Sequence, residues 1–186
     1  MGADGYATAI EPLLDEFVSP PVVVGHSFGG RVAVCLAAGN PGRVGRLVLT
    51  GSPLLRLGPG PAPSIGYRLA RGLKRLGVLS DQQMEAMRKS RGSADYRASS
   101  GVMRDILVMV VNESYEPQLR ALATPVALLW GSEDHVVPVA VAERALTVIA
   151  EGGGIAKLEI LAGVGHLIPT EAPDALRRIV DEALQS

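Results

Sequence analysis

One stretch near the N-terminus constrains the fold more than any other, because an apolar run there turns at a glycine-flanked serine into a helical segment. Residues 21–25, Pro-Val-Val-Val-Gly, are short, rich in β-branched side chains and without polar alternation, which predicts a buried parallel strand. The chain then turns at His26–Gly30, and a helix is predicted from Phe28 to Ala38, ended by Gly39-Asn40-Pro41.

The alternation of strand and helix recurs on both sides of a middle segment. Further strands are predicted at residues 44–50, 125–130 and 157–161, and further helices at 4–17, at 138–150 with Pro138 as first helical residue, and after Thr170 as N-cap. Strands that alternate with helices build a parallel sheet with right-handed crossovers. The predicted fold class is therefore α/β, a parallel sheet of about four strands flanked by helices.

Residues 53–117 interrupt this alternation. The run Gly58–Pro63, Gly-Pro-Gly-Pro-Ala-Pro, cannot be helix or central strand, and amphipathic helices are predicted after it. The predicted organisation is a core of residues 1–52 and 118–186 with an insertion at 53–117. Basic side chains of the insertion either attract an anionic substrate or form solvated helix faces, and the second interpretation is favoured.

Composition excludes several classes of function. Of the 186 residues, 47% are hydrophobic and 20% charged, typical of one compact domain, and the net charge of −1 argues against nucleic acid or an anionic membrane as partner. The single cysteine, Cys35, allows no intrachain disulfide, and no signal peptide or membrane-spanning run is recognisable. We expect a cytoplasmic protein without stable membrane insertion, and without metal or cofactor.

The chemistry is expected at Gly25-His26-Ser27-Phe28-Gly29, which matches the pattern G-x-S-x-G. Side chains at the two flanking positions are expected to clash in so sharp a turn, so glycine at 25 and 29 leaves the Ser27 hydroxyl exposed on a strained turn. The N-terminus of the following helix supplies free N–H donors and partial positive charge where an oxyanion would form.

A serine hydroxyl needs a base and an oriented acid to become a nucleophile. The chain has three histidines, and His166 follows the last predicted strand, at the sheet edge where active sites of open α/β sheets lie. His26 is committed to the turn, and His135 remains an alternative base. The loop after the third strand offers two carboxylates, Glu133 and Asp134.

These motifs resemble the α/β-hydrolase superfamily, in particular its small esterases, haloperoxidase-like enzymes and C–C-bond hydrolases. The resemblance lies in residues 22–30, in Gly-x-x-Asp-x-x-x-Pro at 131–138, and in Gly-x-Gly-His at 163–166, which leads into Glu171-Ala172-Pro173. It implies Ser27 as nucleophile, Asp134 rather than Glu133 as acid, and His166 as base. It also implies that the Phe28 N–H contributes to an oxyanion hole and that residues 53–117 form a helical cap.

The reaction expected from the resemblance is hydrolysis of a small carboxylic ester, thioester or lactone through an acyl-enzyme. Cleavage of a carbon–carbon bond, or perhydrolysis, would use the same triad and remains open. A non-catalytic binding module is the alternative from another class.

The pattern departs from the family at its beginning. Family members carry several strands before the serine turn and often a His-Gly loop that supplies a second oxyanion donor, whereas here the turn begins about 25 residues into the chain. We therefore expect an apolar sheet edge open to self-association or a partner chain. A fragment, a late start codon and a subunit completed by another chain are all compatible with this departure.

Overall fold

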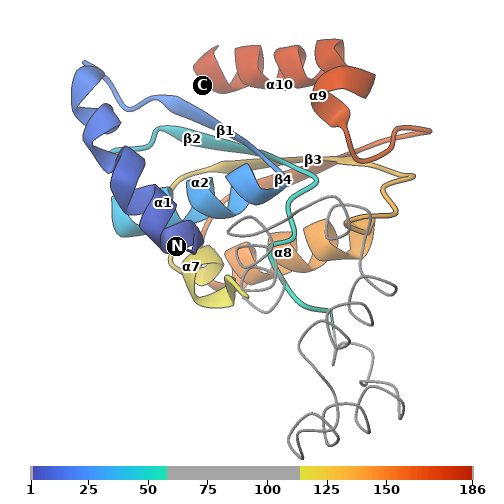
Figure 1. Cartoon of the computed structure of the whole chain (residues 1–186), viewed down its shortest axis with the longest axis horizontal. Helices are drawn as coiled ribbons and strands as arrows, with labels where there is room; N and C mark the ends of the chain where they lie inside the picture. Colours follow the sequence, from blue (N-terminus) through green and yellow to red (C-terminus); the bar gives the residue numbers. More distant parts are fainter. Residues whose placement is uncertain (1, 58–113, 186) are drawn as a thin grey trace, which may run out of the picture. The chain divides into compact units, whose positions relative to one another are not determined.

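The computed structural model describes residues 2–57 and 114–185, which contain a four-stranded parallel sheet between helices (Figure 1). The strands lie in sequence order and are β1 (Val22–His26), β2 (Arg46–Thr50), β3 (Val126–Gly131) and β4 (Ala156–Leu161). Each strand pairs in parallel with the next. The predicted α/β fold class is confirmed.

Helices cover both faces of this sheet (Figure 1). The elements besides the strands are α1 (Ala3–Ile10), η1 (Glu11–Glu16), α2 (Phe28–Gly39), α7 (Glu116–Arg120), α8 (Val139–Glu151), α9 (Ile168–Glu171) and α10 (Pro173–Gln185). Helices α2 and α8 pack on one face, where α1 and α7 contact them, and α10 packs on the other face against β1 and β2. No helix of the described residues is long and apolar enough to cross a membrane.

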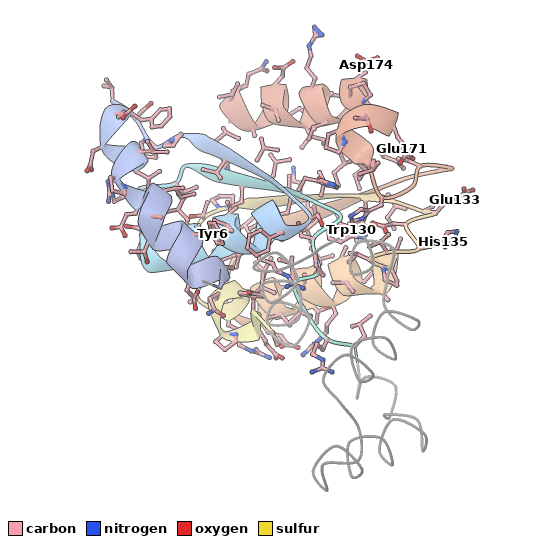
Figure 2. The ribbon with its side chains drawn as sticks, in the orientation of Figure 1. Tyr6, Trp130, Glu133, His135, Glu171 and Asp174 are labelled. Carbon is pink, nitrogen blue, oxygen red and sulfur yellow. The ribbon has the colours of Figure 1, made fainter. Side chains whose placement is uncertain are left out.

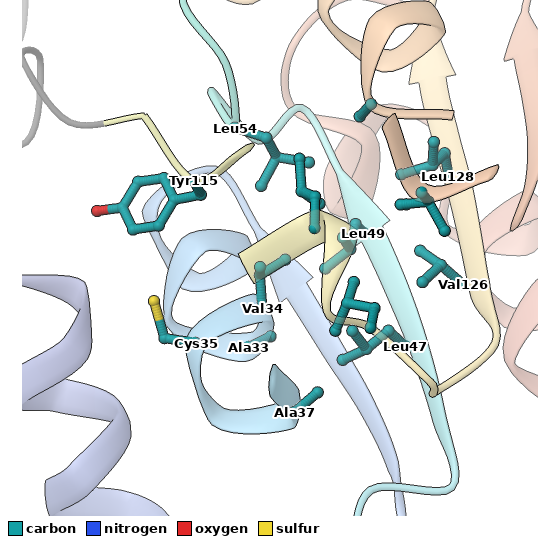
Figure 3. Close-up of a cluster of buried hydrophobic side chains, with 14 of the residues drawn as sticks. Ala33, Val34, Cys35, Ala37, Leu47, Leu49, Leu54, Tyr115, Val126 and Leu128 are labelled. Atoms are coloured by element: carbon teal, nitrogen blue, oxygen red, sulfur yellow. The ribbon is translucent and has the colours of Figure 1, made fainter. Parts of the chain in front are cut away.

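The side chains on the two faces of the central strands belong to two different apolar clusters. Leu47 and Leu49 of β2, with Val126 and Leu128 of β3, pack with side chains of the helix α2 in the larger cluster (Figure 3). The intervening residues of these strands, such as Val48 and Leu129, point to the smaller cluster under α10. Because side chains alternate along a strand, an apolar run is what a sheet covered on both faces requires.

The first predicted helix is two elements rather than one. Helix α1 ends at Ile10, and Glu11–Glu16 form a 3₁₀ helix. Pro12 explains the change, because a proline has no N–H to donate to the carbonyl four residues earlier. Phe17, predicted on the apolar face of a continuous helix, is 55% exposed.

Two predicted helix starts were wrong. Pro138 is the N-cap with ψ 148°, and α8 begins at Val139. Thr170 lies inside the short helix α9, where its hydroxyl donates to the Leu167 carbonyl at 3.0 Å. The last helix, α10, begins at Pro173, because a proline is well tolerated as the first helical residue.

Strand β1 is parallel as predicted, but the prediction that it is buried was wrong. Within the described residues it pairs with β2 alone and is an edge of the sheet. Val24 is 45% exposed in consequence. The open edge expected from the sequence is therefore present in this part of the chain, and its use for self-association or a partner remains a prediction.

The described residues belong to a unit formed by residues 1–57 and 113–186. Residues 58–113 lie outside the description, so the helical cap remains a prediction. Leu54 and Tyr115, at the two ends of the predicted insertion, are both buried in the larger cluster. The Tyr115 N–H donates to the Leu54 carbonyl at 3.0 Å, so these two flanking segments lie side by side in the core.

The two glycines that open α2 differ in their surroundings, which yields a test. A Cβ at Gly30 would lie 1.8 Å from Oγ of Ser52, which is buried and bonded to the Thr50 carbonyl, whereas a Cβ at Gly29 meets no described atom within 4 Å. We expect Gly30→Ala to lower the free energy of unfolding by ~1–3 kcal/mol through overpacking. The matched Gly29→Ala should leave it unchanged or raise it by up to ~1 kcal/mol. Urea unfolding measures the free energy of unfolding of both variants. Equal changes in the two variants would contradict the close packing of Gly30 against Ser52.

Candidate active site

Ser27 lies at the sharp turn between β1 and α2. Its backbone angles are φ 50° and ψ −117°, and it is the only non-glycine residue with a positive φ among the described residues. Such a backbone costs on the order of 1–3 kcal/mol and persists only where its surroundings hold it. The Ser27 N–H donates to the Thr50 carbonyl at 2.9 Å, which ties the turn to the end of β2.

Close backbone packing explains one of the two predicted flanking glycines. A Cβ at Gly25 would lie 2.6 Å from the Gly30 Cα and 2.8 Å from the Gly29 carbonyl oxygen, so no side chain fits there. At Gly29 the predicted clash was wrong, since a Cβ there meets no atom of the described residues within 4 Å. The second crowded position is Gly30, against Ser52. In the sequence, the only indication of this crowding is that Gly29 is followed by a second glycine, Gly30.

His166, in the loop after β4, joins the serine to a carboxylate. Its Nε2 lies 3.3 Å from Ser27 Oγ, and its Nδ1 lies 2.9 Å from Asp134 Oδ2. An ionised carboxylate only accepts hydrogen bonds, so Nδ1 carries the hydrogen and Nε2 is left to accept from the serine hydroxyl. The structure thus brings together the three side chains that the sequence analysis selected, from loops after three different strands.

Asp134 is buried, and both oxygens of its carboxylate take part in hydrogen bonds. Its side chain has 0% exposure. Oδ1 accepts from the N–H groups of Val136 at 2.9 Å and Val137 at 2.7 Å, while Oδ2 faces His166. Three hydrogen bonds offset the cost of burying a charge. Glu133, the other carboxylate of this loop, is exposed, and Figure 2 shows it at the outer end of the loop.

Trp130 supports the loop that carries Asp134. The indole is fully buried, and its Nε1–H donates to the Val137 carbonyl at 2.8 Å. Val137 therefore bonds to the tryptophan through its carbonyl and to Asp134 through its N–H.

Two glycines, Gly51 and Gly131, to which the sequence analysis assigned no structural role, let the loops approach one another. A Cβ at Gly51, which has φ 50°, would lie 2.9 Å from His166 Nδ1 and 3.3 Å from Asp134 Oδ2. A Cβ at Gly131 would lie 2.2 Å from the Val164 carbonyl oxygen. Both glycines stand at the carboxyl end of a strand, at or directly after its last residue, and that position was the signal available in the sequence.

Glu171 holds the backbone on both sides of His166. One carboxylate oxygen accepts from the Gly165 N–H at 2.7 Å, and the other accepts from the Leu167 N–H at 3.0 Å. Glu171 belongs to the Glu-Ala-Pro run noted after the histidine motif, and Figure 2 shows it beside this loop. It therefore restricts the position of the His166 backbone without touching the imidazole.

The other two histidines do not contact the serine hydroxyl. His26 Nδ1 lies 2.9 Å from Thr50 Oγ1, and the His26 and His166 ring centroids are 5.0 Å apart. Burial lowers the pKa of His26 below its ordinary value, and the neighbouring His166 lowers it further. His135 is exposed at the outer end of its loop (Figure 2). No group of three or more metal-binding side chains occurs in the part of the chain that the structure describes.

Comparison with known proteins identifies the family. The sequence model of the alpha/beta hydrolase family matches residues 2–179. The chain belongs to this family.

Individual relatives narrow the resemblance. The chain is 31% identical to a 2-hydroxy-6-oxononadienedioate/2-hydroxy-6-oxononatrienedioate hydrolase of Dechloromonas aromatica, in a match covering 94% of the chain and 65% of that protein. It is 28% identical to the enzyme of that name from Paraburkholderia xenovorans, with 96% and 67% covered. The chain thus spans about two thirds of the length of these relatives.

Solved structures agree on the fold of this hydrolase family. A meta-cleavage product hydrolase from Pseudomonas fluorescens gives a TM-score of 0.65 at 21% identity, covering 100% of the chain and 72% of that structure. A thermophilic esterase from Thermogutta terrifontis gives 0.62 at 21% identity, with the same coverage.

The lowered pKa of His26 predicts how stability responds to acid. The unfolded chain takes up a proton at this residue near pH 6.5, before the folded chain does, so unfolding becomes easier as pH falls below that value. His26→Gln removes this contribution, which is at most about 1.4 kcal/mol per pH unit. Between pH 7.5 and 5.5 we expect the variant to lose less unfolding free energy than the parent, in urea titrations.

The exposed His135 provides the control for this prediction. His135→Gln makes the same substitution at an exposed position, so the pH dependence of stability should follow the parent. An unchanged dependence in His26→Gln would contradict the effect of burial at that site.

Proposed function

We propose that this chain acts as a serine hydrolase, with Ser27 as nucleophile, His166 as general base and Asp134 as the group that orients and stabilises the histidine. The observation that carries the proposal is the unbroken contact from Ser27 Oγ to His166 Nε2 at 3.3 Å and from His166 Nδ1 to Asp134 Oδ2 at 2.9 Å. Membership of the alpha/beta hydrolase family supports an enzymatic role.

The geometry suits acyl transfer to water. His166 Nε2 takes the hydroxyl proton as Ser27 Oγ forms a bond to a carbonyl carbon, and the resulting imidazolium is stabilised by the buried Asp134 carboxylate. The imidazolium then protonates the leaving group as its bond to the carbonyl carbon breaks. Water, deprotonated by the same imidazole, releases the acyl group from Ser27 and restores the hydroxyl.

The negative oxygen of the tetrahedral intermediate needs a donor close to Ser27. Phe28 is the first residue of α2, where N–H groups have no carbonyl partner within the helix. Its N–H and the positive end of the helix therefore support Phe28 as one oxyanion donor, as the family resemblance implies.

For the substrate we propose a carbon–carbon bond next to a ketone in a 2-hydroxy-6-oxo dienoate. This departs from the ester, thioester or lactone expected first from the sequence, and it rests on the names of the relatives that match 94–96% of the chain. The attack on the carbonyl is the same, but the leaving carbon must be protonated. A carboxylic ester is the second candidate, supported by an esterase among the fold neighbours.

Labelling with a fluorophosphonate tests the nucleophile. The probe should modify Ser27, as located by peptide mass spectrometry, and labelling should disappear in Ser27→Ala. By analogy with other triads, His166→Ala and Asp134→Asn should lower kcat by roughly 10³-fold or more. Labelling of another residue, or undiminished labelling of Ser27→Ala, would overturn the proposal.

A comparison of two substrates tests the reaction class. We expect a higher kcat/KM for a 2-hydroxy-6-oxo dienoate, followed by loss of its absorbance, than for p-nitrophenyl acetate. The reverse order would favour the ester hydrolase.

Gly51 provides a test of how the histidine is positioned. Gly51→Ala places a methyl group 2.9 Å from His166 Nδ1, and we expect fluorophosphonate labelling to slow by up to ~10²-fold. The matched variant is Gly153→Ala, whose φ of 84° imposes comparable backbone strain of ~1–2 kcal/mol with no described atom within 4 Å of the new Cβ. Labelling of Gly153→Ala should proceed at the parental rate. Equal rates in both variants would mean that contact at Gly51 does not position His166.

A further inference from the structure

A cavity of about 410 Å³ lies at the end of the sheet opposite Ser27. Residues at or next to the amino ends of three strands contribute to it, among them Arg46 of β2, Val126 of β3 and Lys157 of β4, and the carboxyl-terminal half of α10 contributes Ile179 and Ala183. Its volume falls within the range of about 300–1,000 Å³ that is typical of small-molecule sites.

The floor of this cavity is apolar. Ala127 on the sheet and Ala183 on α10 are small, and between the two elements they leave the space that larger side chains would fill. Ile179 of α10 is buried in the smaller apolar cluster, and Ala183 packs against the same cluster. At the rim, Ile155 is 66% exposed. A hydrocarbon chain in this space would remove apolar surface of both partners from water.

The charged side chains around the cavity are not balanced. Glu159 and Glu182 line it, but Arg178 binds both carboxylates. Arg46 and Lys157 also line it, and neither makes an ion pair with any residue in the described ranges 2–57 and 114–185. Counting Arg178, three cations face two carboxylates among these described residues, so one positive charge is in excess beside the apolar floor.

The strand register places Arg46 and Lys157 on the face that α10 covers. Lys157 pairs with Ala127 on β3, and Ala127 pairs with Val48 on β2. Val48 belongs to the cluster under α10, and Arg46 stands two residues before it, so the alternation of a strand puts Arg46 on the same face. Lys157 thus lies beside Ala127, and Arg46 lies on the same face two residues before the β2 partner of Ala127.

We propose that this cavity binds an amphipathic carboxylate, a straight hydrocarbon chain of medium length with one anionic head. The carboxylate lies between Arg46 and Lys157, and the chain lies along Ala127, Ile179 and Ala183. The site is separate from Ser27 and does not depend on the proposed hydrolysis.

Octanoate is the probe, used with the full chain in calorimetric titrations and in amide NMR spectra. We expect saturable binding that shifts the amides of Ala127 and Ala183. Because a buried methylene contributes about 0.8 kcal/mol, octanoate should bind about tenfold more tightly than hexanoate. Octanoate should also bind about tenfold more tightly than octanol, which has the same chain and no charge.

Variants of the protein distinguish binding of the ligand's carboxylate from binding of its hydrocarbon part. In the double variant Arg46→Gln with Lys157→Gln, the preference for octanoate over octanol should disappear, whereas Arg177→Gln, an exposed cation of α10 that does not line the cavity, should keep it. In Ala183→Leu the floor is filled, and affinity for both ligands should fall.

Three results would overturn the proposal. One is the absence of saturable binding of octanoate, and another is a preference for octanoate that survives in the double variant. The third is a set of amide shifts at Ser27 and His166 in place of those at Ala127 and Ala183.

Discussion

Parallel pairing of the four strands in sequence order is the constraint on which the site depends. All four carboxyl ends meet at one edge of the sheet, and each delivers a part of the site at or just after its last residue. Ser27 directly follows β1, and Thr50 and Gly51 lie at the end of β2. Asp134 lies in the loop after β3, and His166 lies in the loop after β4. Residues up to 139 positions apart become hydrogen-bonded neighbours because the sheet aligns the ends of their strands.

The buried carboxylate illustrates how the loops hold one another. An ionised side chain with 0% exposure is tolerable only with its oxygens satisfied, and Asp134 receives two backbone N–H groups of its own loop. The loop is fixed in turn by the buried indole of Trp130. The imidazole thus meets an acceptor whose position is set by the backbone.

Close approach of the loops requires positions without side chains. Gly25 lies against the first turn of α2, Gly51 against His166, and Gly131 against the loop that carries the histidine. The strained Ser27 backbone lies among these contacts, with its N–H bonded to β2. Strain at the serine is therefore supported by packing around it, as expected where a reactive side chain must stand clear of the fold.

The order of strands and helices, the serine turn and the histidine loop follow from the sequence, because apolar runs, glycines and prolines act over a few residues. The choice of Asp134 over Glu133 needed the family resemblance, and burial then separated the two neighbours in space. Tertiary structure alone decided the crowding at Gly30 and Gly51 and the support of His166 by Glu171. Each of these depends on which distant backbone lies within a few ångströms, and local residue patterns carry no information on that distance.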